Sequence, residues 1–355
     1  MHTVYVSDTT AGSANQTWFV NDREEQLSRV YYRLTNGGTS YILTYSDVID
    51  GTFADGSKSV CNDRCGGFEI VSLRVGVCSH SDMVQAVEPR CWQTVTFGGT
   101  RSRVVASGET VQTDPIAVTV RGGETLCVEL CAKGCRLPCH EELQIAAFVK
   151  DGDEWRPSTH LPVPLTVAVA GDPLPVVGFF GDSITQGIGA TPNAYRHVAA
   201  RLGERLKGKA ACHNLGIGFG RASDAASGGA WFARAAKTDV VVLCFGVNDL
   251  IRGRAAEEIA ADLGTVIARL QQGGTKVVLQ AVPPFEFAPP AKAEWERLNA
   301  LIRKTLSRCA DAFLDTVFLC DACGDPRYGG HPNDAGCAVW AEKLLLPLEA
   351  LLTRI

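Results

Sequence analysis

Three polar side chains lie where they could do chemistry in the second half of this sequence. Ser183 follows the apolar run 174–181 and opens a helical pattern, Asn248 follows the run 239–246, and His331 lies near the C-terminus. A serine between a strand and a helix is exposed at the strand tip and faces the positive end of the helix dipole, which favours a developing oxyanion. Ser183 is therefore a candidate nucleophile, although serine also favours helix N-termini for purely structural reasons.

Short apolar runs alternate with helical patterns from about residue 174 onward. The runs contain almost no charge, as is typical of strands that are buried on both faces of a parallel sheet. We predict a doubly wound α/β domain over residues 171–355, with its chemistry at the carboxyl ends of the strands. The predicted strands are 174–181, 211–216, 239–246, 276–282 and 311–319, and the predicted helices are 194–208, 255–273, 293–310 and 335–355.

The first half of the chain has a different rhythm. Short runs rich in Thr, Val and Gly alternate with turn residues, and no helical pattern of ten or more residues interrupts them. This indicates an antiparallel β-sandwich, or jelly roll, over residues 1–170, ending in a proline-punctuated stretch at 160–176. The predicted strands are 40–48, 68–77, 93–99, 116–123, 125–132 and 143–149.

The composition of the chain limits the classes of molecule that it is expected to bind. The 355 residues carry a formal net charge of −5, and this provides no basic face for nucleic acid or anionic lipid. Neither a signal-peptide pattern nor an apolar run of about 18 residues is visible. We expect a cytoplasmic protein that acts on a small, uncharged substrate, without nucleic-acid or membrane partners.

The chain has 14 cysteines, and two interpretations of them stay open. Several lie inside apolar strand-like runs, where a thiol behaves as a small hydrophobe, and this favours reduced thiols. The alternative is a zinc site, although its three-residue spacings are unusual. The candidate ligands are Cys131, Cys135, Cys139 and His140, with Cys61 and Cys65.

Four short motifs occur in order at the predicted strand tips: GDSITQG (181–187), NLGIG (214–218), GVND (246–249) and HPND (331–334). Together they resemble the four blocks of the SGNH (GDSL) hydrolase family. The resemblance covers residues 174–355, and its specificity comes from the order of all four blocks. The first half is similar, more weakly, to the β-sandwich domains that precede the catalytic domain in some family members.

The resemblance implies a serine esterase. Ser183 would attack an ester carbonyl, and His331 would take its proton and later deliver it to the leaving alcohol. The oxyanion would be bound by the Ser183 N–H, the Asn248 side chain and an N–H of the second block. The usual offset for that last donor falls on Phe219, so Gly218 and Gly220 on either side of it are both candidates. Neither a metal nor an organic cofactor would be needed.

One position departs from the family pattern. The aspartate that usually lies three residues before the histidine is Tyr328 here, and Asp325 lies six before. A Ser–His dyad, with a backbone carbonyl of residues 328–330 orienting the imidazole, is the favoured hypothesis. Asp325 as the third member of a triad is the alternative; either would fix the imidazole tautomer.

The class of ester that serves as substrate is inferred from the domain layout. A β-sandwich before such a domain, with a possible dyad, is similar to the layout of certain polysaccharide acetylesterases. We therefore predict a carbohydrate O-acetylesterase acting on oligosaccharides. A general short-chain carboxylesterase or lipase-like acylhydrolase is the alternative enzyme, and a carbohydrate-binding protein with a decayed site is the alternative of another class.

Overall fold

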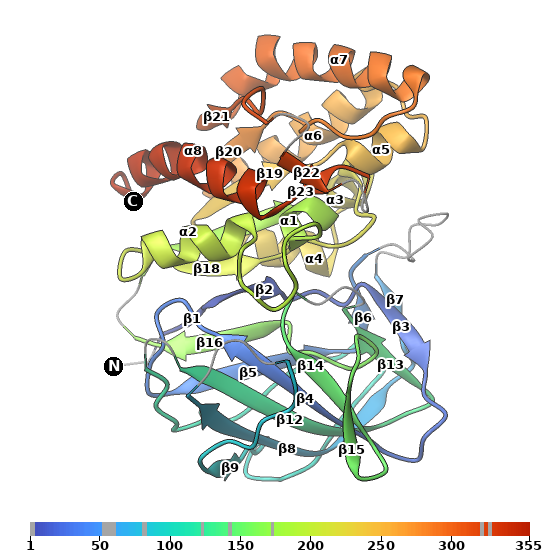
Figure 1. Ribbon diagram of the computed structural model, residues 1–355, viewed down its shortest axis with the longest axis vertical. Coiled ribbons are helices and arrows are strands. Elements are labelled where there is room, and N and C mark those ends of the chain that lie inside the picture. Colours follow the sequence, from blue (N-terminus) through green and yellow to red (C-terminus); the bar gives the residue numbers. More distant parts are fainter. Residues whose placement is uncertain are drawn as a thin grey trace.

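The computed structural model describes residues 4–51, 62–79, 84–121, 124–140, 144–171, 174–319, 323–325 and 329–355. An N-terminal β-region, residues 4–170, lies below an α/β part in Figure 1, and the two are in direct contact along one edge of the α/β sheet. Within the described residues, no helix is long and apolar enough to cross a membrane.

The α/β part is built on a parallel sheet, as predicted, and this sheet has six strands where five were expected. Every residue of its strands β17 and β19 is buried, because helices cover the sheet. The strand order is β2 (Thr9–Gly12), β18 (Ala211–Asn214), β17 (Val176–Gly181), β19 (Val240–Cys244), β20 (Lys276–Gln280) and β21 (Ala312–Leu314).

The helices fall into two packed groups. The long helix α8 packs against α2 and against strands β19 and β20, whereas α6 packs against α3 and α7. Their bounds are α1 (Ser183–Gln186), α2 (Val198–Leu206), α3 (Ala222–Ser227), α4 (Ala230–Ala235), α5 (Val247–Ile251), α6 (Ala256–Gln272), α7 (Pro289–Lys304) and α8 (Asp334–Leu352), with a 3₁₀ turn at Leu306–Arg308.

Strand β2 is the unexpected member of the sheet. It comes from the first dozen residues of the chain and pairs in parallel with β18, with Thr9 opposite His213 and Gly12 opposite Asn214. Figure 1 shows it, in dark blue, between the β-region and the α/β part. Its sequence, TTAG, has no apolar run that could have predicted a buried strand. The edge of the parallel sheet therefore belongs to the N-terminal segment.

The β-region consists of antiparallel sheets, which confirms the all-β prediction. A four-stranded sheet has the order β1 (Tyr5–Ser7), β16 (Thr166–Ala170), β5 (Tyr41–Ser46) and β11 (Thr110–Gln112). A seven-stranded sheet has the order β10 (Arg103–Val105), β8 (Phe68–Cys78), β12 (Thr125–Lys133), β4 (Gln26–Arg33), β14 (Ala147–Asp151) and β15 (Glu154–Pro157), with β9 (Trp92–Thr94) pairing with β8.

Three two-stranded pairs complete the architecture. They are β3 (Thr17–Val20) with β13 (Arg136–Cys139), β6 (Val48–Ile49) with β7 (Asp63–Arg64), and β22 (Gly324–Asp325) with β23 (His331–Pro332). Buried side chains from the two large sheets of the β-region form one common core, which includes Tyr41 and Leu43 from one sheet and Tyr32 and Val75 from the other.

Two local predictions for the β-region were wrong. The segment 116–123 was expected to be a strand, but in its described part only Ile116 and Val120 pair, each through an isolated bridge. The second error is an omission: no strand was predicted where the central strand β4 lies. Its pattern is broken by Arg29, which is nevertheless buried because its guanidinium binds Glu129 at 2.6 Å on the neighbouring strand.

Candidate active site

Ser183 is the first residue of α1, a single helical turn that follows β17 directly. Asp182 caps this turn, because its Oδ1 accepts the Ile184 N–H at 3.0 Å. The turn ends at Gly187, whose φ of 116° suits glycine, and the N–H groups of Gly187 and Ile188 both donate to the Ser183 carbonyl at 3.0 Å. Asp182 therefore supports the turn.

His331 lies beside Ser183 although 148 residues separate them in the chain. The Ser183 Oγ is 2.7 Å from Nε2 of His331, which is a hydrogen-bond distance. The ring of Phe285 meets the imidazole edge-on at 5.0 Å between centroids. On another side Gly189 leaves no room, since a Cβ there would lie 2.8 Å from the His331 Cβ. Packing therefore restricts the orientation of the imidazole.

The partner of His331 on its far side stays a prediction. Asp325 pairs with His331 across the β22–β23 ladder, so its backbone is close to the histidine. The Asp325 side chain and the whole of Tyr328 lie outside the described residues. Of the carbonyls expected to orient the imidazole, that of Gly329 accepts the Glu286 N–H at 3.0 Å, which ties this loop to the residues after β20.

The second block forms a tight turn after β18. The Gly220 N–H donates to the Ile217 carbonyl at 3.1 Å, so the turn itself uses this group. In the described part of the chain, the N–H groups of Gly218 and Phe219 have no acceptor. Phe219 has a φ of 62°, a left-handed conformation that glycine normally adopts. Gly218 and Phe219 thus retain donors for an oxyanion, and Gly220 does not.

Asn248 is buried near the start of α5 and linked to this turn. Its Nδ2 donates to the Gly220 carbonyl at 3.0 Å, which leaves the second amide hydrogen for another acceptor. The neighbouring Asp249 accepts the Ala222 N–H at 2.8 Å and forms an ion pair with Arg254 at 2.7 Å. The second and third blocks are therefore held together by direct hydrogen bonds.

Burial shifts the titration of the acids around the nucleophile. It raises the pKa of Asp182 to about 7, and the nearby charge of Asp249 acts in the same direction. Burial also raises the pKa of Asp249, against the lowering effect of Ala222 and Arg254.

Three further histidines are buried, and each has a backbone carbonyl as partner. The rings of His140, His197 and His213 contact the carbonyls of Ala14, Thr10 and Leu165 respectively. Burial lowers their pKa values to about 4, about 4 and about 3. All three are therefore neutral at physiological pH, and their geometry is structural.

The cysteine tract does not assemble a metal centre among the described residues, in which no group of three or more His, Cys, Asp or Glu is arranged to hold an ion. Both ring nitrogens of His140 face other groups, the Ala14 carbonyl and the Gln186 side chain, each at 2.9 Å. Cys139 is buried, whereas Cys135 is exposed. Cys61 lies outside the described residues.

A cavity of about 740 Å³ lies beside His331. It is bordered by Gly330 and Pro332 on either side of the histidine, and by the aromatic rings of Phe285, Phe287 and Trp295. The rings of Phe285 and Phe287 are 5.7 Å apart and those of Phe287 and Trp295 6.1 Å apart. The sequence did not predict that Phe285 and Phe287 line the site. Their segment, FEF (285–287), nevertheless follows β20 at the carboxyl edge of the sheet, where a site was expected.

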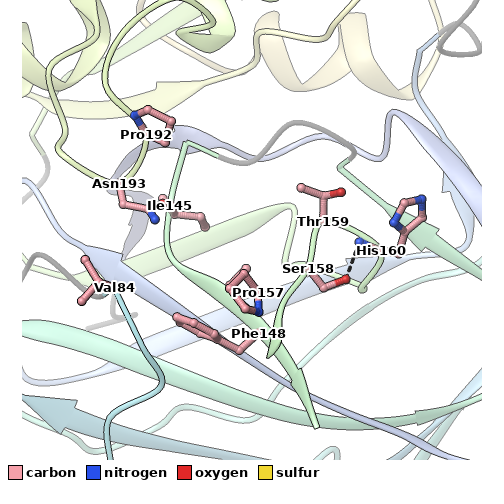
Figure 2. A pocket seen from close by; sticks show the side chains of 10 residues that line it. Val84, Ile145, Phe148, Pro157, Ser158, Thr159, His160, Pro192 and Asn193 are labelled. Carbon is pink, nitrogen blue, oxygen red and sulfur yellow. Dashed lines mark hydrogen bonds between the residues drawn. The ribbon is translucent and has the colours of Figure 1, made fainter. Parts of the chain in front are cut away.

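A second cavity, of about 430 Å³, lies between the β-region and the loop after α1. In Figure 2, Pro192 and Asn193 of that loop face Ile145 and Phe148, and Ser158, Thr159 and His160 form a polar edge. The same loop reaches the active-site side, because the Thr191 N–H donates to Asp334 at 2.8 Å, three residues after His331. Both regions of the chain thus line this cavity.

Several solved structures each match about half of this chain. A carbohydrate esterase family 3 structure from Talaromyces cellulolyticus has 19% identity and a TM-score of 0.43, and the match covers 51% of this chain and 100% of that one. The acetyl xylan esterase AlAXEase has 24% identity and a TM-score of 0.39, with 48% and 97% covered. A putative lipolytic G-D-S-L protein from Desulfitobacterium hafniense has 17% identity and a TM-score of 0.41, with 48% and 98% covered.

No curated protein matches the sequence. The family comparison is more specific, because residues 179–339 match the family described as GDSL-like Lipase/Acylhydrolase. This range contains the nucleophile turn, the second and third blocks and His331. Residues 179–339 of this chain therefore form a GDSL-like lipase/acylhydrolase domain.

Proposed function

We propose that this protein is a serine esterase that removes O-acetyl groups from oligosaccharides through an acyl-enzyme on Ser183. The observation that carries the proposal is the 2.7 Å contact between the Ser183 Oγ and Nε2 of His331. At this distance the imidazole accepts the hydroxyl proton as Oγ attacks the ester carbonyl. The same contact argues against a decayed binding protein.

Charge develops on the carbonyl oxygen as the tetrahedral intermediate forms. The Ser183 N–H at the start of α1, the second amide hydrogen of Asn248 and the N–H of Gly218 or Phe219 are the proposed donors. One such donor can lower the barrier by about 3 kcal/mol. The intermediate then collapses, His331 gives its proton to the leaving alcohol, and water attacks the acyl-enzyme by the reverse route. These steps involve no metal or organic cofactor.

The cavity beside His331 supports a sugar as the alcohol part of the ester. The leaving oxygen has to lie within hydrogen-bond reach of Nε2 to receive its proton. A space of about 740 Å³ next to that histidine can hold more than one sugar ring. Its wall combines aromatic faces with the charged side chains of Glu286 and Lys292, and this mixture suits a ligand with apolar ring faces and polar edges.

The test is acetate release from acetylated xylo-, manno- and cello-oligosaccharides, measured beside aryl esters of increasing acyl length. Faster turnover of one sugar series than of aryl acetate is the expected result. Activity that is confined to aryl esters and rises with chain length would instead establish a general short-chain carboxylesterase or lipase-like acylhydrolase. No release from any ester, together with sugar binding unaffected by Ser183→Ala, would establish a binding protein.

A further inference from the structure

The nucleophile turn is bonded to a histidine of the β-region. Gln186 is the last residue of α1, and its fully buried side chain places Nε2 2.9 Å from Nε2 of His140. His140 directly follows β13 and lies 46 residues before Gln186 in the chain. Ser183 and Gln186 are the two ends of one helical turn, so whatever holds Gln186 also holds the nucleophile.

The direction of this hydrogen bond is determined by the other side of the imidazole. Nδ1 of His140 lies 2.9 Å from the Ala14 carbonyl, which can only accept, so Nδ1 carries the hydrogen. Because burial lowers the pKa of His140 to about 4, the ring is neutral and Nε2 is a bare acceptor. The Gln186 amide N–H therefore donates to Nε2.

The surroundings leave this pair no room to move. A Cβ on Gly12 of β2 would lie 2.2 Å from Nε2 of His140, and a Cβ on Gly216 would lie 2.2 Å from the backbone nitrogen of Gln186. The Asn214 side chain donates to the Thr10 carbonyl at 2.9 Å and to the Gln186 carbonyl at 3.4 Å. The end of α1 is therefore enclosed by β2 and by the second block.

We propose that His140 is a positioning residue for Ser183, which it acts on through Gln186 without touching the substrate. The inference rests on the proposed role of Ser183 as nucleophile. A four-residue turn has too few internal hydrogen bonds to be rigid by itself. A displacement of about 1 Å at a nucleophile can lower the rate by about 100-fold. The β-region is thus part of the catalytic apparatus through a residue that contributes no chemistry of its own.

The first variant is His140→Phe, which keeps the ring but removes the acceptor. In the full-length protein we expect kcat on aryl acetate to fall by about 10- to 100-fold while KM changes by less than about threefold, because substrate contacts are intact. His140→Gln, which can present an acceptor oxygen near the former Nε2, should recover most of that loss. Tyr31→Phe is the matched control: in the β-region it removes the hydroxyl that donates to the Val87 carbonyl at 2.8 Å and accepts the Val87 N–H at 2.9 Å. The control should leave kcat unchanged.

A second variant covers the case in which His140→Phe does not fold. Gln186→Leu removes the donor and fills similar space, and it should lower kcat by a similar factor. In the double variant, the two losses should not multiply, because the second substitution removes a contact that is already broken. Full multiplication of the losses would overturn the proposal, as would a folded His140→Phe or Gln186→Leu with kcat within twofold of the parent.

Labelling by a fluorophosphonate separates this proposal from the proposed function. The reagent should form an adduct on Ser183 in the parent, detected by peptide mass, and should form it about 10- to 100-fold more slowly in His140→Phe. No adduct in the parent would contradict the role of Ser183. An adduct that forms at equal rates in both proteins would contradict only the positioning role of His140.

Discussion

In the proposed mechanism, Ser183 and His331 react only as a pair. The serine hydroxyl needs a base because it is a weak nucleophile when protonated, and the base is useful only within hydrogen-bond reach. Their 2.7 Å contact satisfies this requirement. Removing either partner should therefore remove nearly the whole catalytic advantage.

For Ser183→Ala and His331→Ala, we expect kcat on aryl acetate to fall by at least about 1,000-fold, because each member of such a pair is needed for the other to act. Initial-rate kinetics measure this, with circular dichroism to show folding. Ser227→Ala on α3 is a suitable control, since the Ser227 hydroxyl donates to the Asp224 carbonyl at 2.6 Å within the same helix. Folded variants that retain parental turnover would refute the proposed pair.

The dyad hypothesis makes a separate prediction for Asp325→Ala. If a backbone carbonyl orients the imidazole, kcat should stay within about tenfold of the parent. A true triad would lose on the order of 10⁴-fold, because the histidine would lose its tautomer. The same kinetic assay decides between them, and a loss of 1,000-fold or more would assign Asp325 as the third member.

At the scale of elements, the one-turn helix α1 depends on its cap. Asp182 accepts the Ile184 N–H, yet its burial makes the charged form costly. With a pKa near 7 in the native state against 3.8 as the reference value, the native protein holds a proton that the unfolded chain releases. The contribution of Asp182 to stability is therefore present at low pH and is lost as pH rises from about 4 to about 7.

Asp182→Asn should remove that pH dependence while keeping the cap, since an asparagine oxygen accepts the same N–H. We expect the stability of the variant relative to the parent to increase from pH 4 to pH 7 and then to level off. Urea unfolding at several pH values provides the free energies. A difference that does not change over this range would show that Asp182 is ionised throughout in the native state.

The segment between β20 and α7 has a different task from α1. It supplies the aromatic wall of the cavity beside His331, and Trp295 is fixed there by a hydrogen bond from Nε1 to the Val282 carbonyl at 2.9 Å. No step of the proposed chemistry uses this ring. Its effect should therefore appear in substrate binding.

Trp295→Ala should raise KM for acetylated oligosaccharides by about tenfold, which corresponds to about 1.4 kcal/mol of lost binding. On aryl acetate, kcat should stay within about twofold. Trp155→Ala on β15, far from this cavity, is the control for removing a half-buried tryptophan. Equal effects on both classes of ester would argue against a sugar subsite at this wall.

For the whole molecule, one contact between the β-region and the α/β part is a buried ion pair. Arg234 of α4 binds Asp50 through two hydrogen bonds of 2.6 and 3.1 Å, and Asp50 is fully buried. Asp50 also accepts the Asn15 N–H at 2.9 Å. Because the Asp50 carboxylate is shielded from water, it depends on the Arg234 guanidinium to compensate its charge.

Arg234→Met should consequently destabilise the protein by about 3–5 kcal/mol, the usual cost of leaving a buried charge unpaired. Adding Asp50→Asn should recover much of the loss, since the neutral amide still accepts the Asn15 N–H. Urea denaturation followed by tryptophan fluorescence measures both variants. Additive losses in the double variant would show that the ion pair is not the unit that matters.

The sequence by itself determined the class of fold, and it was sufficient to predict the candidate residues of the site. The turns after β17, β18 and β19 are local structures, and their residues reflect local requirements: a cap at Asp182, a glycine at 187 and a short amide side chain at 248. Buried parallel strands likewise appear in the sequence as continuous apolar runs. Such features can be recognised because each depends on neighbouring residues in the chain.

Only the tertiary structure decided what depends on distant residues. The strand β2 has no apolar signal and exists because β18 offers an open edge about 200 residues later. The bond between His140 and Gln186 and the aromatic wall beside His331 arise in the same way. Their free energy lies in contacts between separate segments, and no local periodicity records which segments will meet.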